Sequence, residues 1–242
     1  VGPPVLQGWY DYLKCMGKET IIPRKANKPM FVAAPLLGLA SVLITAMLLP
    51  VAGLTILNSS TDTIVILYLL TFASVTMIMG SAASGSPFAG VGLSREMVAM
   101  ISYELPLVFV LLAVGRIAGT GSELGVTFSF TEISAWQAQN GPVLFRWSMI
   151  PAAVAMLFVI PCEVGQQPFD IDEAETEICE GVLAEYSGKP LAQFKLMHYV
   201  KMYIMSALFV ALFLNVHTGI AALDVVIFVV LCVAVTFVSM SV

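Results

Sequence analysis

Apolar residues run through this chain in six stretches, and most of them are long enough to cross a bilayer as a helix. A transmembrane helix needs about 20 mostly apolar residues, and only the fourth stretch is clearly shorter. We expect spans at 29–51, 63–83, 96–116, 145–161, 194–215 and 220–242. The pattern predicts an all-α, polytopic transmembrane helix bundle that forms one domain over residues 29–242.

Residues 1–28 are too polar to cross a membrane, yet they are rich in aromatic residues. Trp9, Tyr10 and Leu13 alternate with charged residues such as Asp11 and Lys14. This alternation is typical of an amphipathic helix that lies in the membrane interface. The other interpretation of the segment 1–28 is a disordered basic tail.

The connecting segments carry unequal basic charge, which predicts the orientation of the chain. Lys and Arg concentrate before the first span, in the second loop and around the start of the fifth span: Lys14, Lys18, Arg24, Lys25, Lys28, Arg95, Lys189 and Lys195. Because loops rich in Lys and Arg stay in the cytoplasm, we place these segments there. The expected location is the cell membrane, with multiple passes.

Composition excludes a soluble domain. The mean hydropathy is +0.93, and only 11% of residues are charged, against about a quarter in soluble domains. No basic patch with interleaved aromatics indicates nucleic-acid binding. The chain opens on Val1 rather than Met, so we expect it to be part of a longer polypeptide.

Half of the sixteen acidic residues lie between the fourth and fifth spans, in a predicted cytoplasmic loop over 162–193, here called the acidic loop. Neither Lys nor Arg interrupts them: Glu163, Asp170, Asp172, Glu173, Glu175, Glu177, Glu180 and Glu185. Like charges and nearby apolar surface favour proton uptake by carboxylates. The loop is therefore a candidate proton-handling site, with a solvated acidic helix as the plainer alternative.

Pro168 is well placed to begin a helix within the acidic loop, because its missing N–H costs nothing in the first turn. On such a helix Asp170, Glu173, Glu177 and Glu180 would share an arc of about 80°. The spacing therefore predicts one stripe of four carboxylates on the loop.

Glu104 lies about two turns inside the third predicted span, where charge is costly and indicates function. Pro106 follows Glu104 closely and frees the Ser102 carbonyl, and Glu96 lies about 80° round the same helix. We expect both acids to address one cavity as part of a proton path. The alternative for Glu104 is a structural pair with a basic residue.

Lys201 lies two turns into the fifth span and needs an acidic partner, for which Glu104 or Glu185 is the candidate. Arg95 is expected to anchor its helix at the interface. The chain has four cysteines without a C-x-x-C pair, so we expect no metal site or cofactor in this chain alone and no catalytic residue.

Several segments resemble one known family. They are Glu163, Pro168-Phe169-Asp170-Ile171, Glu173-Ala174-Glu175, Glu177, Gly181, Glu185-Tyr186-Ser187-Gly188, Gly2-Pro3-Pro4, Ala26-Asn27-Lys28-Pro29 and Ser102-Tyr103-Glu104-Leu105-Pro106. The first group resembles the signature loop of the membrane subunit shared by respiratory complex I and the membrane-bound, energy-converting nickel–iron hydrogenases. The Glu-Ala-Glu and Glu-Tyr-Ser-Gly segments are more similar to the hydrogenase branch. Many relatives carry Arg before the Pro-Phe-Asp motif, where this chain has Gln167.

The resemblance implies a proton-path subunit that anchors a ferredoxin-driven hydrogenase complex and couples its electron transfer to ion movement. It implies hydrogenase large and small subunits and antiporter-like subunits as partners, with iron–sulfur clusters and the nickel–iron centre in those partners. Pro168, Phe169, Tyr186, Ser187 and Gly188 would form the interface motif.

Three alternatives stay open. The chain could belong to a complex I-like quinone reductase and bind quinone between the amphipathic helix and the first spans. It could be a cation transporter without a redox partner, or a structural anchor alone. The transported ion could be H+ or Na+.

Overall fold

The computed structural model describes residues 6–51, 62–119, 125–171, 174–216 and 221–241, and the elements below lie within them. Nine α-helices are described in these ranges: α1 Gln7–Gly17, α2 Lys28–Leu48, α3 Thr63–Ser84, α4 Pro87–Ala118, α5 Phe130–Asn140, α6 Ile150–Val164, α7 Glu175–Ile178, α8 Lys189–Phe213 and α9 Ala221–Ser241. Short 3-10 turns form at Val143–Phe145, Trp147–Met149 and Gly181–Leu183. The predicted all-α bundle is confirmed.

Six of these helices are long and apolar enough to span a membrane, which confirms the six predicted spans. The largest difference is in α4, which begins at Pro87 rather than at residue 96. Proline is favoured in the first helical turn, and the apolar pattern alone gave no sign of this start. The 32 residues of α4 extend about 48 Å, well beyond a hydrocarbon core of about 30 Å. One end of α4 therefore reaches the acidic loop.

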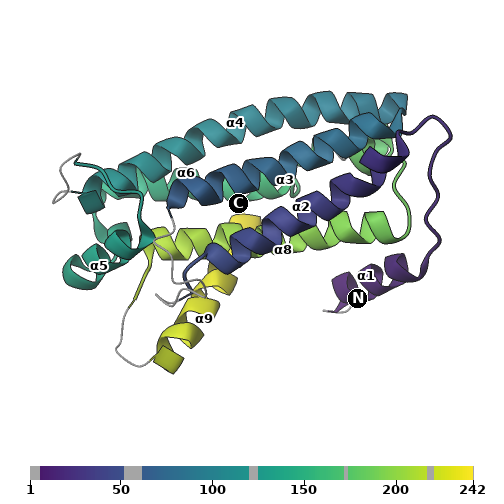
Figure 1. The fold of residues 1–242 in the computed structure, drawn as a ribbon. Helices are drawn as coiled ribbons and strands as arrows, with labels where there is room; N and C mark the ends of the chain where they lie inside the picture. Colours follow the sequence, from purple (N-terminus) through teal and green to yellow (C-terminus); the bar gives the residue numbers. More distant parts are fainter. Residues whose placement is uncertain (1–5, 52–61, 120–124, 172–173, 217–220, 242) are drawn as a thin grey trace.

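The central helix of the bundle is α8 (Figure 1). It packs against α2, α6 and α9, and its residues Ile204–Phe213 are buried without interruption. A helix that is buried on all sides needs no amphipathic face. The outer helices α4 and α9 instead expose large apolar residues such as Ile101, Phe109 and Phe237, as expected for contact with lipid.

The two ends of the bundle differ. At one end α5 covers the end of α8, where the Gln137 side-chain amide donates to the Leu212 carbonyl at 2.7 Å and its oxygen accepts from the Asn215 N–H at 3.0 Å. At the opposite end lie α1 and the start of α2 (Figure 1). Here α1 is helical and exposes Trp9, Tyr10 and Leu13, as the amphipathic pattern predicted.

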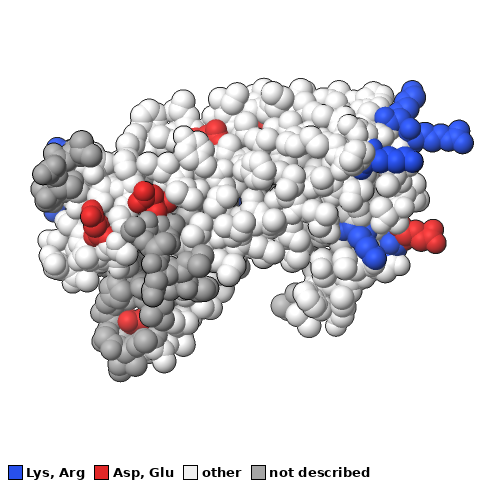
Figure 2. Space-filling model, viewed as in Figure 1, with Lys and Arg blue, Asp and Glu red and all other residues white. Residues whose placement is uncertain are grey.

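Basic side chains gather at the α1 end of the bundle (Figure 2). Lys18, Arg24, Lys25 and Lys28 are exposed there, close to the start of α2. This clustering is what the positive-inside rule requires of one membrane face. The cytoplasmic assignment of that face stays a prediction.

Candidate functional site

A buried ion pair joins α6 to α8. The Lys201 Nζ lies 2.9 Å from Glu163 Oε1, and both side chains are almost fully buried. Glu163 falls in the last turn of α6, which ends at Gly165 with a φ of 70°. The end of α6 is therefore fastened to α8 at the pair.

The ion pair continues into two hydroxyl groups on other helices. Lys201 donates to the Ser74 hydroxyl of α3 at 2.8 Å, and that hydroxyl is hydrogen-bonded to the Tyr103 hydroxyl of α4 at 2.9 Å. The Lys201 ammonium also lies 5.8 Å from the centre of the Tyr103 ring. Ser74, Tyr103, Glu163 and Lys201, here called the charged cluster, thus link α3, α4, α6 and α8.

Two further carboxyl groups of α4 interact with the charged cluster. Tyr103 interacts electrostatically with Glu163, Glu96 and Glu104, and Glu163 also interacts with Glu104. Glu96 is buried, whereas Glu104 is half-buried. The Oε1 atom of Glu104 is buried with no hydrogen-bond partner in the described part of the chain. The two acids that the sequence placed at one cavity therefore share one electrostatic neighbourhood.

The predicted partner of Lys201 is wrong. In the structure Lys201 pairs with Glu163 rather than with Glu104 or Glu185. Sequence spacing could not identify the partner, because the contact depends on how deeply the end of α6 lies beside α8. Glu185 is half-buried in the loop that leads into α8.

The predicted carboxylate stripe is also wrong. No helix begins at Pro168, and α7 spans only Glu175–Ile178. Cys179 and Glu180 have φ angles of 52° and 65°, which a right-handed helix does not allow. Asp170 lies before α7 and Glu180 after it, so they share no helical face with Glu177. Asp172 and Glu173 lie outside the described residues.

Arg95 connects α4 to the acidic loop. Its Nη1 lies 2.9 Å from Glu177 Oε2 and donates to the Ile171 carbonyl at 3.2 Å. Because the Glu177 side chain is 63% exposed, the ion pair adds at most about 1 kcal/mol of stability. The expectation that Arg95 anchors α4 at the interface stays a prediction; in the structure Arg95 contacts the acidic loop at Ile171 and Glu177.

The end of the acidic loop is packed into the bundle through Tyr186. Its ring stacks on Phe31 at 4.1 Å and meets the edge of Phe194 at 4.9 Å. Its hydroxyl donates to the Phe31 carbonyl at 3.3 Å. Burial raises the pKa of the Tyr186 phenol above its ordinary value. This aromatic contact fixes the loop to α2 and α8.

The two residues after Tyr186 hold the segment that follows α1. The Ile21 N–H donates to the Ser187 hydroxyl at 3.0 Å. Gly188 has a φ of 63°, and a Cβ there would lie 2.7 Å from the Glu19 carbonyl oxygen. Glycine therefore allows the two chain segments to meet. Pro168 is exposed and Phe169 is half-buried, and the role of these five residues as a partner interface stays a prediction.

Sequence reasoning missed Ser74 and Tyr103 as members of the charged cluster. Tyr103 stands beside Glu104 in the Ser-Tyr-Glu-Leu-Pro segment, which was a usable signal. Ser74 gave none, because a serine in an apolar span is commonly bonded within its own helix. Only the packing of α3 against α4 brings the two hydroxyls together.

Within the described residues, no group of three or more His, Cys, Asp or Glu side chains could hold a metal ion. The expectation that redox centres belong to partner subunits stays a prediction. The charged cluster has the groups that hold and pass protons. Its carboxyl, ammonium, hydroxyl and phenol groups come from four helices and lie in contact.

The fold and this site define a polytopic membrane protein with an ionisable network inside its bundle. The family model described as NADH dehydrogenase matches residues 1–242. The chain belongs to this family, and its similar curated relatives are H-type subunits of NADH-quinone oxidoreductases.

The relative from Rhizobium rhizogenes (strain K84) is 34% identical over 235 residues, which cover 89% of this chain and 63% of the relative. The relative from Aquifex aeolicus is 34% identical over 226 residues, 89% of this chain and 65% of the relative. The chain therefore spans less than two thirds of these relatives.

A solved structure has the same fold. A chain of the membrane-bound sulfane sulfur reductase, an archaeal respiratory membrane complex, superposes with a TM-score of 0.87 over 99% of this chain and 77% of its own length. The sequences are 24% identical. At that identity the likeness establishes the shared fold.

Proposed function

We propose that this chain is the membrane subunit that couples electron transfer in adjacent iron–sulfur subunits to ion movement across the membrane. The observation that carries the proposal is the charged cluster. A buried ion pair can be replaced by apolar residues without loss of stability, so structure alone does not require it. A role in moving charge accounts for both the pair and its hydroxyl partners.

The proposed path begins at the acidic loop and enters the bundle at Glu163. A proton on Glu163 removes the charge that Lys201 neutralises and also changes the field at Glu104, because the two carboxyl groups interact. A change of charge on a partner beside the acidic loop would shift a proton between them.

We assign the complex to the hydrogen-evolving, ferredoxin-driven branch. The support is the resemblance of Glu173-Ala174-Glu175 and Glu185-Tyr186-Ser187-Gly188 to that branch. A second candidate is a complex I-like quinone reductase, which the names of the similar curated relatives favour. Both candidates use the same path inside this chain.

The proposal is tested with Glu104→Gln in the whole complex, reconstituted in vesicles. We expect normal assembly and electron transfer, with ion uptake per turnover reduced at least tenfold, since positioned acid–base groups contribute about 10²-fold or more. A pH-sensitive dye and a sodium-sensitive dye inside the vesicles measure uptake and identify the ion. Glu132→Gln is the control, because Glu132 lies in α5, at the end of the bundle opposite α1 and the acidic loop (Figure 1). Unchanged uptake by Glu104→Gln would reject the path.

A further inference from the structure

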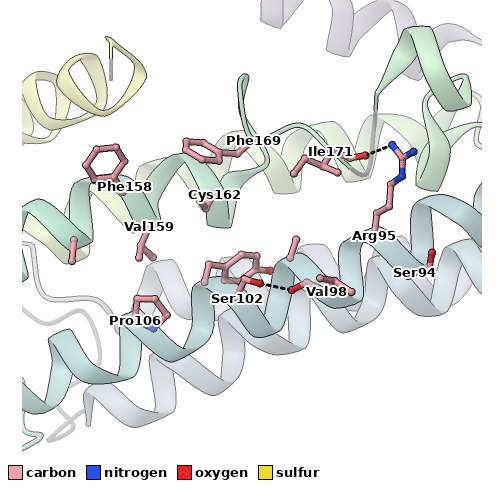
Figure 3. A pocket seen from close by; sticks show the side chains of 13 residues that line it. Ser94, Arg95, Val98, Ser102, Pro106, Phe158, Val159, Cys162, Phe169 and Ile171 are labelled. Atoms are coloured by element: carbon pink, nitrogen blue, oxygen red, sulfur yellow. Dashed lines mark hydrogen bonds between the residues drawn. The ribbon is translucent and has the colours of Figure 1, made fainter.

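A cavity of about 680 Å³ lies between α4 and α6 (Figure 3). Val98, Ser102 and Pro106 line it from α4, and Phe158 and Cys162 line it from α6. Phe169 of the acidic loop also contributes to its wall. Tyr103 is the one residue that it shares with the charged cluster.

The cavity has one charged end and a mostly apolar interior. Arg95 lies at one end, near Ile171, and Pro106 lies toward the other (Figure 3). The two residues are eleven positions apart on α4, which is about 16 Å along the helix axis. The Ser102 hydroxyl is turned back on its own helix, where it donates to the Val98 carbonyl at 2.8 Å. The interior is therefore mostly apolar, which favours contact with a hydrocarbon chain.

Size and length limit what can fit. Cavities of about 300–1,000 Å³ hold small ligands, whereas a whole helix is about 10 Å across and could only lie over the opening. A length of about 16 Å corresponds to half of a hydrocarbon core of about 30 Å. One hydrocarbon chain that enters from the membrane surface matches this shape.

Arg95 indicates which chemical group could bind at the charged end of the cavity. Both of its contacts to the acidic loop are made by Nη1, and a guanidinium carries five N–H donors. It can therefore keep Glu177 and also bind an anionic oxygen, for which phosphate is a preferred partner.

We propose that the cavity binds a membrane phospholipid, with one hydrocarbon chain between α4 and α6 and its phosphate at Arg95. The bound chain lies against Tyr103 and excludes water from that side of the charged cluster. This inference does not depend on the proposed path or on the electron acceptor.

The test uses the whole complex in phosphatidylcholine vesicles that contain a phosphatidylglycerol with a photoreactive diazirine in its hydrocarbon chain. After illumination, mass spectrometry locates the adducts. We expect them on the cavity-lining residues of α4 and α6. Ala155→Phe fills the cavity and should lower these adducts about fivefold or more, with Val98→Phe as a second filling variant if the first does not assemble. Ala40→Phe, on the exposed side of α2, should leave them unchanged.

The head group is tested by competition with unlabelled phosphatidylglycerol. Arg95→Gln should raise the concentration that halves the adducts by about three- to tenfold, as expected for one charge-assisted contact. Arg24→Gln, exposed at the same end, should not change it.

Three results would overturn the proposal. The first is adducts that avoid α4 and α6. The second is adducts on a neighbouring subunit in place of these helices, which would mean that a protein segment fills the cavity. The third is displacement by an isoprenoid quinone at concentrations at which phosphatidylglycerol does not compete.

Discussion

At the scale of single residues, the buried pair of Glu163 and Lys201 is the most consequential feature of this chain. Removing one member of a buried ion pair leaves an uncompensated charge, which costs about 3–5 kcal/mol, whereas replacing both members is often close to neutral. Glu163 and Lys201 form such a buried ion pair, because their charged groups are 2.9 Å apart and both side chains are almost fully buried.

We therefore predict that Lys201→Met lowers the free energy of unfolding by about 3–5 kcal/mol at neutral pH. Lys201→Met combined with Glu163→Gln should recover most of that loss, because no charge is then left unpaired. Thermal unfolding of the purified complex in detergent measures both. Lys195→Met is the control, since Lys195 is half-exposed two turns earlier on α8. A double variant no more stable than Lys201→Met would contradict this account.

The sequence was sufficient to single out Glu163, Glu104 and Lys201, because charge beside or within an apolar span is costly wherever it lies. It was not sufficient to pair them. The sequence suggested Glu104 or Glu185 as the partner of Lys201, and only the packing of α6 against α8 selects Glu163.

At the scale of elements, the six spans follow directly from apolar length, while the acidic loop does not follow from its helical spacing. Tertiary contacts, rather than helical spacing, determine the conformation of the acidic loop. Arg95 holds it near Ile171 and Glu177, and Tyr186 holds its end between Phe31 and Phe194. A short acidic segment has little intrinsic helical stability to oppose these contacts.

The packing of α4 can be tested with two of its glycines. A Cβ on Gly115 would overlap the Thr127 carbonyl oxygen of the backbone, whereas a Cβ on Gly90 meets no atom within 4 Å. We predict that Gly115→Ala lowers stability by about 1–3 kcal/mol, as other overpacked sites do, and that Gly90→Ala is neutral or stabilising by up to about 1 kcal/mol. Thermal unfolding of the two variants gives the comparison. Equal melting temperatures would show that α4 does not approach the segment at Thr127 this closely.

At the scale of the whole molecule, the bundle is asymmetric. Its α1 end carries the exposed basic residues and the acidic loop, and the opposite end is closed by α5 over α8 (Figures 1 and 2). Glu163 of the charged cluster lies in the last turn of α6, where the chain enters the acidic loop. Electron-transfer partners are therefore expected at the α1 end.

The proposed electron acceptor leads to a prediction for the intact complex. Purified through a tag on this chain, it should bring iron–sulfur subunits with it and evolve hydrogen from reduced ferredoxin without added quinone. Gas chromatography of the head space measures the hydrogen. Activity that requires quinone would favour the complex I-like alternative, and purification without iron–sulfur subunits would favour a separate cation transporter.

The sequence by itself determined the membrane class, the six spans, the amphipathic α1 and the residues whose charge is costly. These follow from local hydrophobicity and spacing, which act on each segment separately. The tertiary structure decided that Lys201 pairs with Glu163, that Ser74 and Tyr103 extend the pair, and that the acidic loop does not form one helix. These contacts join residues far apart in the chain, and their geometry depends on the depth and rotation at which whole helices pack.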